Sequence, residues 1–142
     1  MSGRQHMDIN GFLQAIPYAR FLGMSATLED GIVTTTLSFD PKLVGNPRLP
    51  AIHGGAIGGF LEMTAIAQLV LETGVALPPK PIGITVEYLR SGRPQDTFAA
   101  ARITKQGRRV VNVSVEAWQD DRTKPIATAH GHFLLRQPDD SA

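Results

Sequence analysis

Glu62 lies in the one stretch of the chain that combines apolar helix character with groups able to do chemistry, residues 51–71. Between residues 56 and 71 the only polar side chains are Glu62, Thr64 and Gln68, so a helix there is apolar on nearly every side and is expected to be buried. A buried carboxylate is costly unless it is paired or kept for chemistry. Three interpretations follow: a structural Glu paired with an Arg or with backbone donors, a catalytic acid or base, or a marker of an exposed side of the helix.

The chemical interpretation joins Glu62 to the segment His53-Gly54-Gly55, because the histidine stands nine residues before the acid. Glycines let a ligand approach the backbone, and unpaired N–H groups at a helix N-terminus attract negative charge. One such preorganised donor contributes roughly 2.7 to 4 kcal/mol to stabilising an oxyanion in a transition state. Glu62 would lie roughly 10 to 13 Å further along the helix axis. That gap is too long for one chain, but it suits a site in which a second copy supplies one half.

Length and composition set the broad class. The 142 residues predict one domain over residues 1–142, with an ordered core at about 8–135 and polar termini. A net charge of +1 predicts no nucleic-acid partner, and the lack of cysteine excludes disulfides, thiolate catalysis and cysteine metal sites. The N-terminus lacks the apolar core of a signal peptide, and no uncharged apolar run reaches the roughly 18 residues of a membrane span. We therefore expect a soluble, cytoplasmic protein without a membrane partner.

The chain before the central helix predicts two short helical turns followed by a β-hairpin. Asp30-Gly31 is a strong two-residue hairpin signal between strands over residues 24–29 and 32–39. Residues 40–50, rich in proline and glycine, predict a long loop of the kind that is often functional. This loop delivers the chain to His53 and the central helix.

Four further strands are predicted after the helix, over residues 82–89, 97–105, 109–119 and 126–135. Their short connections favour antiparallel pairing between neighbours, so this half of the chain should form a meander. One long apolar helix and one curved antiparallel sheet would then share a core. The predicted fold class is α+β, with the sheet wrapped around the helix.

These residues, taken together, resemble a known family. The order of the elements, the His53-Gly54-Gly55 motif, the acid nine residues later and the strand segment ITVEYLR at 84–90 are similar to the hot-dog-fold acyl-CoA thioesterases. Within them the chain resembles the PaaI-like branch of the 4-hydroxybenzoyl-CoA thioesterase superfamily, over roughly residues 13–135. The resemblance implies hydrolysis of a small acyl-CoA at the interface of a homodimer, or of a dimer of dimers, with no metal and no bound cofactor.

The resemblance also implies roles for particular residues. The backbone N–H of Gly54 or Gly55 polarises the thioester carbonyl, and Glu62 of the other subunit acts as general base or as nucleophile. Asn46 resembles the family's loop asparagine, which would hold the attacking water or the carbonyl. His53 is expected to order the loop, with catalysis as the alternative. Glu62 departs from the aspartate usual in PaaI-like members, which leaves water activation and direct attack both open.

Substrate contacts are expected from Thr64, Tyr88 and Arg90. Thr64 is the helix hydroxyl nearest to Glu62 in sequence, although residues two apart point in different directions on a helix. Tyr88 could line an apolar tunnel for the acyl group. Arg90 belongs to a set of basic residues at strand ends that could meet the phosphates of coenzyme A.

Other functions stay open alongside hydrolysis. A hydratase or dehydratase of the same fold would need an Asp/His pair on a particular loop and helix, which this sequence does not have. A non-catalytic acyl-CoA-binding or regulatory module would hold its ligand unhydrolysed, with no role for Glu62 in the ligand's fate. His130 and His132 share one face of the last predicted strand, but without a third ligand nearby we expect no metal site.

Overall fold

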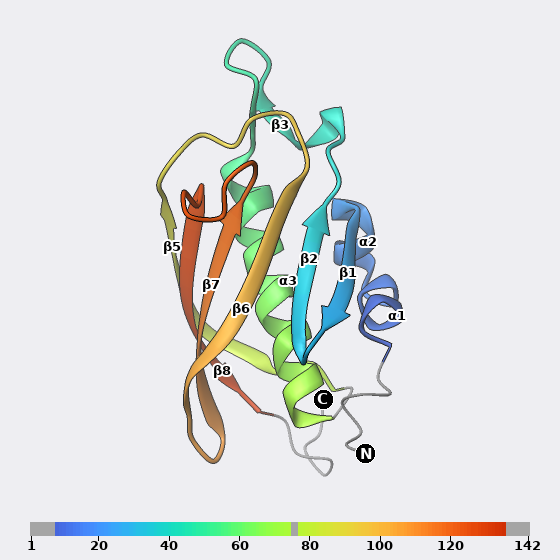
Figure 1. Ribbon diagram of the computed structural model, residues 1–142, viewed down its shortest axis with the longest axis vertical. Coiled ribbons are helices and arrows are strands. Elements are labelled where there is room, and N and C mark those ends of the chain that lie inside the picture. The colour runs from blue at the N-terminus through green and yellow to red at the C-terminus, as the bar shows by residue number, and fades with distance from the viewer. Residues whose placement is uncertain (1–7, 75–76, 136–142) are drawn as a thin grey trace.

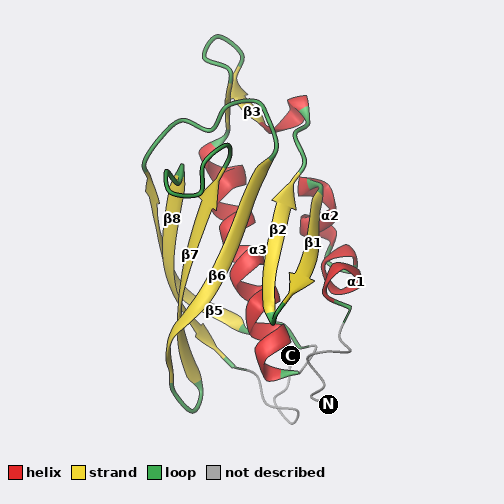
Figure 2. Cartoon of the chain, viewed as in Figure 1, coloured by secondary structure: helices red, strands yellow, loops and turns green. Residues whose placement is uncertain are grey.

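The protein is described by a computed structural model that covers residues 8–74 and 77–135. One long helix, α3, lies across one face of a six-stranded antiparallel sheet, and two short helices pack beside the sheet edge (Figures 1 and 2). The expected polar tails lie outside the described residues. The elements are, in chain order, α1 (Ile9–Gln14), α2 (Pro17–Leu22), β1 (Met24–Glu29), β2 (Ile32–Leu37), β3 (Val44–Asn46), β4 (Ala51–Ile52), α3 (Gly54–Thr73), β5 (Lys80–Tyr88), β6 (Thr97–Gln106), β7 (Val110–Trp118) and β8 (Ala127–Leu134).

The strand order in the sheet is β1-β2-β6-β7-β8-β5. Strands β6, β7 and β8 form the predicted meander, but the prediction was wrong for β5, which pairs with β8 at the far edge. Residues 89–96, which join β5 to β6, run over the end of the sheet instead of making a tight turn (Figure 1). Because a tight turn is what forces neighbouring strands to pair, this longer connection leaves β5 free to occupy the edge. A sheet of this order wrapped on one helix is the predicted hot-dog fold.

The first hairpin has the turn that its sequence predicts. Asp30 and Gly31 have φ angles of 53° and 75°, both in the left-handed region, and Glu29 pairs with Ile32 across them. Positive φ at both central residues is typical of the type I′ turn, whose twist matches that of the flanking strands. The strand after the turn ends at Leu37, two residues earlier than predicted.

Residues 40–50 are not the open loop that we predicted. Residues Pro41–Leu43 form a 3-10 turn, and β3 pairs with β4 in a small two-stranded sheet that projects beyond the end of the main sheet (Figure 1). Proline at the start of the turn supplies the φ angle that a helical turn needs, which explains why a proline-rich segment is ordered.

Two buried polar side chains fix α3 on the sheet. Gln68 accepts a hydrogen bond from the Val33 N–H at 2.9 Å and donates one to the Gly31 carbonyl at 3.1 Å. The hydroxyl groups of Thr64 and Thr35 lie 2.7 Å apart, both fully buried. Since buried polar groups are costly without partners, these contacts permit only one register of the helix against β2.

Helix α3 is long and apolar enough to cross a membrane by composition alone, yet 72% of its most apolar window is buried inside the protein. Burial to this extent is typical of a helix in a protein core. The helix ends as predicted at Gly74, which has a φ of 70° and donates its N–H to the Val70 carbonyl.

Candidate active site

The entrance of α3 is capped by the side chain of His53. Its Nδ1 accepts a hydrogen bond from the Gly55 N–H at 2.9 Å, so the proton of the neutral ring lies on Nε2. The His53 carbonyl accepts from the N–H groups of Ala56, at 3.0 Å, and Ile57, at 3.2 Å. Among the described residues, the N–H of Gly54 has no partner. Of the two glycines predicted to polarise a carbonyl, Gly54 is therefore the one whose donor is free.

Tyr88, at the end of β5, packs on this first turn of α3. Its hydroxyl donates to the Gly54 carbonyl at 2.8 Å, and its ring would lie 3.4 Å from a Cβ placed on Gly54. The same hydroxyl would lie 3.4 Å from a Cβ on Gly58. Small residues at both positions let the phenol lie directly on the helix. The predicted candidates Gly54 and Tyr88 thus come together in space from segments 34 residues apart.

A cavity of about 340 Å³ opens beside Gly54 and Tyr88, and it also includes the predicted candidate Arg90. Its lining residues come from β4, the start of α3 and the segment after β5: Ala51, Ile52, Gly54, Ile57, Tyr88, Leu89, Arg90, Ser91 and Gly92. We call it the helix-entrance cavity. Gly54, whose N–H has no partner among the described residues, is one of the residues that line it.

A second, smaller cavity of about 160 Å³ shares Arg90 and Ser91 with the helix-entrance cavity. Arg93 and Lys124 add positive charge there, although Arg93 forms an ion pair with Asp120. Hydrogen bonds from the hydroxyl and the N–H of Thr123 lower the pKa of Asp121, the other carboxyl at this cavity, below that of a free aspartate. The region is therefore mixed in charge, not a simple basic patch.

Glu62 is half-buried, and it makes no hydrogen bond or ion pair with the residues that the structure describes. Of the three interpretations, the paired structural Glu does not fit. The expectation of a helix buried on every side was wrong along one strip, where Gly55, Gly58 and Gly59 are also partly or fully exposed. At 100° per residue these positions share one side of the helix with Glu62. The strip carries a carboxylate at one end and the helix entrance at the other.

The free N–H and the carboxylate of one chain do not meet. Gly54 and Glu62 are eight residues apart on the same helix, which corresponds to about 12 Å of axial rise. A single thioester carbon cannot contact both groups at once.

Two of the predicted site residues, Asn46 and Thr64, do not line the helix-entrance cavity. Asn46 lies in the β3–β4 hairpin, where its Oδ1 accepts from the Arg48 N–H at 3.0 Å and so orders the turn. Thr64 has no exposed surface, and its hydroxyl donates to the Phe60 carbonyl at 2.8 Å on the side of α3 that faces the sheet. The predicted substrate contact of Thr64 does not fit this placement, because 200° of helical rotation separates it from Glu62.

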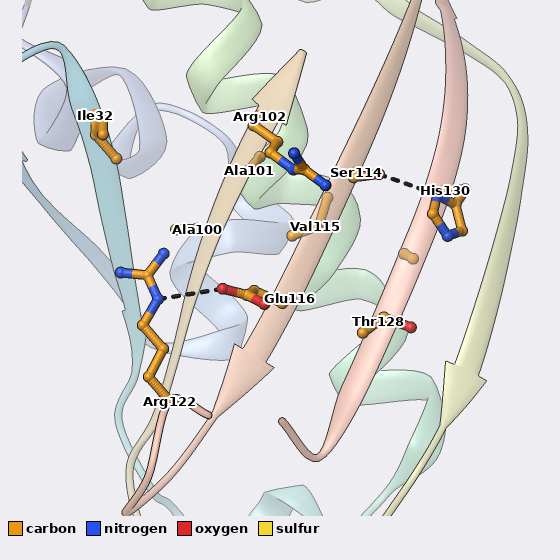
Figure 3. Close-up of a pocket in the computed structure, with 11 residues that line it drawn as sticks. Ile32, Ala100, Ala101, Arg102, Ser114, Val115, Glu116, Arg122, Thr128 and His130 are labelled. Carbon is orange, nitrogen blue, oxygen red and sulfur yellow. Dashed lines mark hydrogen bonds and ion pairs between the residues drawn. The ribbon is translucent and has the colours of Figure 1, made fainter. Parts of the chain in front are cut away.

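A hollow of about 460 Å³ lies on the opposite face of the sheet from α3 (Figure 3). Four of its polar residues form two pairs: Ser114 with His130 at 3.0 Å and Arg122 with Glu116 at 3.2 Å. None of the predicted site residues lines it. Nor do the described residues include a cluster of three or more His, Cys, Asp or Glu side chains able to hold a metal.

Sequence reasoning missed Tyr18 of α2. A Cβ on Gly59 would lie only 2.6 Å from its hydroxyl oxygen, so the phenol lies on the exposed strip of α3 one turn before Glu62. The signal in the sequence is the pair Gly58-Gly59 in mid-helix, where glycine is unfavourable by about 1 kcal/mol unless something packs closely on it.

Comparison with known proteins decides the family. Residues 46–134 match the family described as the acyl-CoA thioesterase N-terminal domain. The chain belongs to the acyl-CoA thioesterase family. It is therefore a thioester hydrolase with the hot-dog fold, as the motif and the order of elements predicted.

Individual relatives are similar over nearly the whole chain. A crystal structure from Chromobacterium violaceum is 42% identical, with a TM-score of 0.75, and the match covers 96% of this chain and 95% of that one. The Escherichia coli PaaI protein, from the phenylacetic acid degradation operon, is 19% identical with a TM-score of 0.72, covering 93% and 95%. The medium/long-chain acyl-CoA thioesterase YigI of Salmonella typhimurium is 24% identical over 144 residues, covering 87% of this chain and 88% of YigI.

Proposed function

We propose that the protein hydrolyses acyl-CoA thioesters at a site shared by two copies of the chain. The N–H of Gly54 in one copy would bind the developing oxyanion, and Glu62 of the other would act as general base or nucleophile. The observation that carries this proposal is the arrangement on α3: a free N–H at its entrance and an unpaired, half-exposed carboxylate about 12 Å further along the same side of the fold.

A twofold axis near the midpoint of these two groups closes the gap. The midpoint falls at Gly58, and twofold symmetry there brings Glu62 of each copy toward Gly54 of the other. Two equivalent sites result, each with one donor and one carboxylate.

The sheet offers one edge for such an association. The edge at β1 is occupied by α1, since the Asn10 side chain accepts from the Ala26 N–H at 3.0 Å and the Gln14 side chain donates to the Met24 carbonyl at 2.8 Å. Among the described strands, β5 pairs only with β8, and apolar residues of β5 such as Ile82 are exposed. An open strand edge with exposed apolar side chains favours pairing with another chain.

In the proposed reaction, Glu62 takes a proton from water, and the hydroxide attacks the thioester carbon. The carbonyl oxygen becomes an oxyanion that the Gly54 N–H binds. The carbon–sulfur bond then breaks, the free acid forms, and the thiolate of coenzyme A accepts the proton from Glu62. In the alternative, the carboxylate attacks the thioester carbon directly, the carbon–sulfur bond breaks and the thiolate of coenzyme A leaves. Water then hydrolyses the resulting anhydride, which releases the acid, restores the Glu62 carboxylate and supplies the proton that the thiolate takes up. Neither route uses a metal or a further cofactor.

The coenzyme A part of the substrate would pass through the helix-entrance cavity. Tyr88 and Arg90 line that cavity, and the neighbouring smaller cavity adds Arg93 and Lys124. Guanidinium and ammonium groups suit phosphate oxygens. YigI is named for medium and long acyl chains, so acyl-CoAs of these lengths are the first substrates to test.

Replacing Gly54 tests the donor. Gly54→Pro removes the N–H at the first helical position, where proline is tolerated, and His53 already has the extended ψ of 134° that precedes proline readily. Gly54→Ala is the matched control, because it adds a Cβ against Tyr88 but keeps the N–H.

We expect kcat for acyl-CoA hydrolysis to fall roughly 100- to 1,000-fold in Gly54→Pro and far less in Gly54→Ala. Equal activity of the two variants would contradict the role of this N–H. Tight binding of acyl-CoA by the wild-type protein with no release of thiol would point instead to a non-catalytic acyl-CoA-binding module.

A further inference from the structure

We infer that Tyr18 and Phe21 of α2 form the wall on which the acyl group lies beside Glu62, and that this wall favours acyl chains of medium length over short ones. The inference rests on the proposed function, since it takes Glu62 as the reacting carboxylate.

The position of Tyr18 places the wall next to Glu62. A Cβ on Gly59 would lie 2.6 Å from the Tyr18 hydroxyl oxygen and 2.7 Å from its Cε2, so the phenol rests on the backbone of α3. Positions 59 and 62 are neighbours on one helix face, with about 5 to 6 Å between their Cβ positions. The ring of Tyr18 therefore ends beside the base of the Glu62 side chain.

Both aromatic rings are exposed, although large aromatic side chains are usually buried. Tyr18 is 45% exposed and Phe21 is 58% exposed, while Ala19 and Leu22 already supply the buried side of α2. The rings stack, with centroids 6.5 Å apart and planes 14° from parallel. An exposed apolar pair next to a reacting group is typical of a surface that an apolar ligand covers.

The wall has a definite end. The ammonium group of Lys42 lies over the Phe21 ring, 4.4 Å from its centre, so a positive charge marks the end of the apolar surface at Phe21. With C–C bonds of about 1.5 Å, about five methylene groups in zigzag span the distance from ring to ring. An acyl chain of about eight carbons would cover both rings, and longer chains would gain little more.

The polarity of the two ends of the site gives the direction of the substrate. The helix-entrance cavity carries Arg90, and the adjoining cavity has Arg93 and Lys124 beside Asp120 and Asp121. The guanidinium and ammonium groups at this end suit the phosphates of coenzyme A. The wall of Tyr18 and Phe21 is aromatic carbon apart from the Tyr18 hydroxyl, and it suits the hydrocarbon part.

The test is kcat/KM for straight-chain acyl-CoAs from two to twelve carbons. For the wild type we expect a rise of roughly twofold for each methylene up to about eight carbons and then a plateau, because one wall buries about half of each methylene. Phe21→Ser should lose the rise beyond about six carbons, and Tyr18→Ser should lose it from about four. Tyr18→Phe keeps the ring and should keep the wild-type profile.

Two further variants test the position of the wall. Gly59→Ala should act like Tyr18→Ser, because its methyl group displaces the phenol, and it should add nothing in the Tyr18→Ser background. Ile32→Ser, a residue 52% exposed on the opposite face of the sheet, is the matched control and should keep the wild-type profile.

The outcomes separate this inference from the proposed function. An unchanged chain-length profile in folded Phe21→Ser and Tyr18→Ser would overturn the wall, while hydrolysis itself would still stand. If the wild type hydrolysed no thioester, the Kd values of S-alkyl-CoA thioethers of the same lengths would decide. A dependence on chain length that is lost in both variants would support the wall, and its absence would overturn it.

Discussion

Substitutions of His53 can show whether this residue caps helix α3 or takes part in catalysis. Its Nδ1 accepts a hydrogen bond from the Gly55 N–H at 2.9 Å, which is the contact of a cap. Loss of an N-cap costs about 1 kcal/mol, within a range of roughly 0.5 to 2. For a domain of this size that corresponds to a fall in Tm of roughly 2 to 4 °C per kcal/mol. Asparagine is among the best capping residues and can accept the same bond. His53→Ala should therefore lower Tm by a few degrees, and His53→Asn should restore it.

The kcat of the His53 variants should depend on whether the helix cap is kept. Because the cap holds the first turn that presents the Gly54 N–H, we expect His53→Ala to lose roughly tenfold in kcat, within the range of a displaced positioning group. His53→Asn should remain within about threefold of the wild type. Removal of a general base costs roughly 100- to 10,000-fold. A loss of that size in a His53→Asn variant with wild-type Tm would refute the capping role and make the imidazole a catalytic group.

The remaining predictions concern stability. Gln68→Leu leaves the N–H of Val33 buried without its partner, so the free energy of unfolding measured in urea should fall by roughly 1 to 3 kcal/mol. Equal stability would show that the Gln68 contacts do not fix the helix. Because the pKa of Asp121 is lowered in the folded state, its contribution is present above the unfolded pKa and is lost as the pH falls through the folded one. An NMR titration of the Asp121 carboxyl should therefore show a midpoint below that of a free aspartate, and a midpoint at or above it would contradict the Thr123 contacts.

Local features of the fold were predictable from the sequence. The I′ hairpin at Asp30-Gly31 and the end of α3 at Gly74 depend on φ angles that the residue types themselves favour. The place of β5 was not predictable in the same way, because its partners in β8 lie 39 to 54 positions away in the sequence, Glu87 with Thr128 being one pair. The connection over residues 89–96 is long enough for β5 to lie beside β6 or at the far edge beside β8.

The candidate site also has features that the sequence predicts and features that depend on how the elements pack. The motif and the acid could be read from spacing, and the prediction of a site shared by two copies followed from helix geometry. Which glycine N–H is free depends on the rotamer of His53, and the buried direction of Thr64 depends on how α3 meets β2. The contact of Tyr18 with Gly59 joins segments 41 residues apart. Such contacts arise only when the elements pack, so the pattern of a single segment does not contain them.

The shared site is tested most directly by mixing two inactive chains. Glu62→Gln lacks the carboxylate and Gly54→Pro lacks the donor, so neither should be active alone. In a mixed dimer, one site combines the intact Gly54 of the first chain with the intact Glu62 of the second. With equal amounts of freely exchanging chains, half the dimers are mixed and each has one working site, so activity should return to about a quarter of the wild-type value. No recovery in a purified mixed dimer would contradict a site built from two chains.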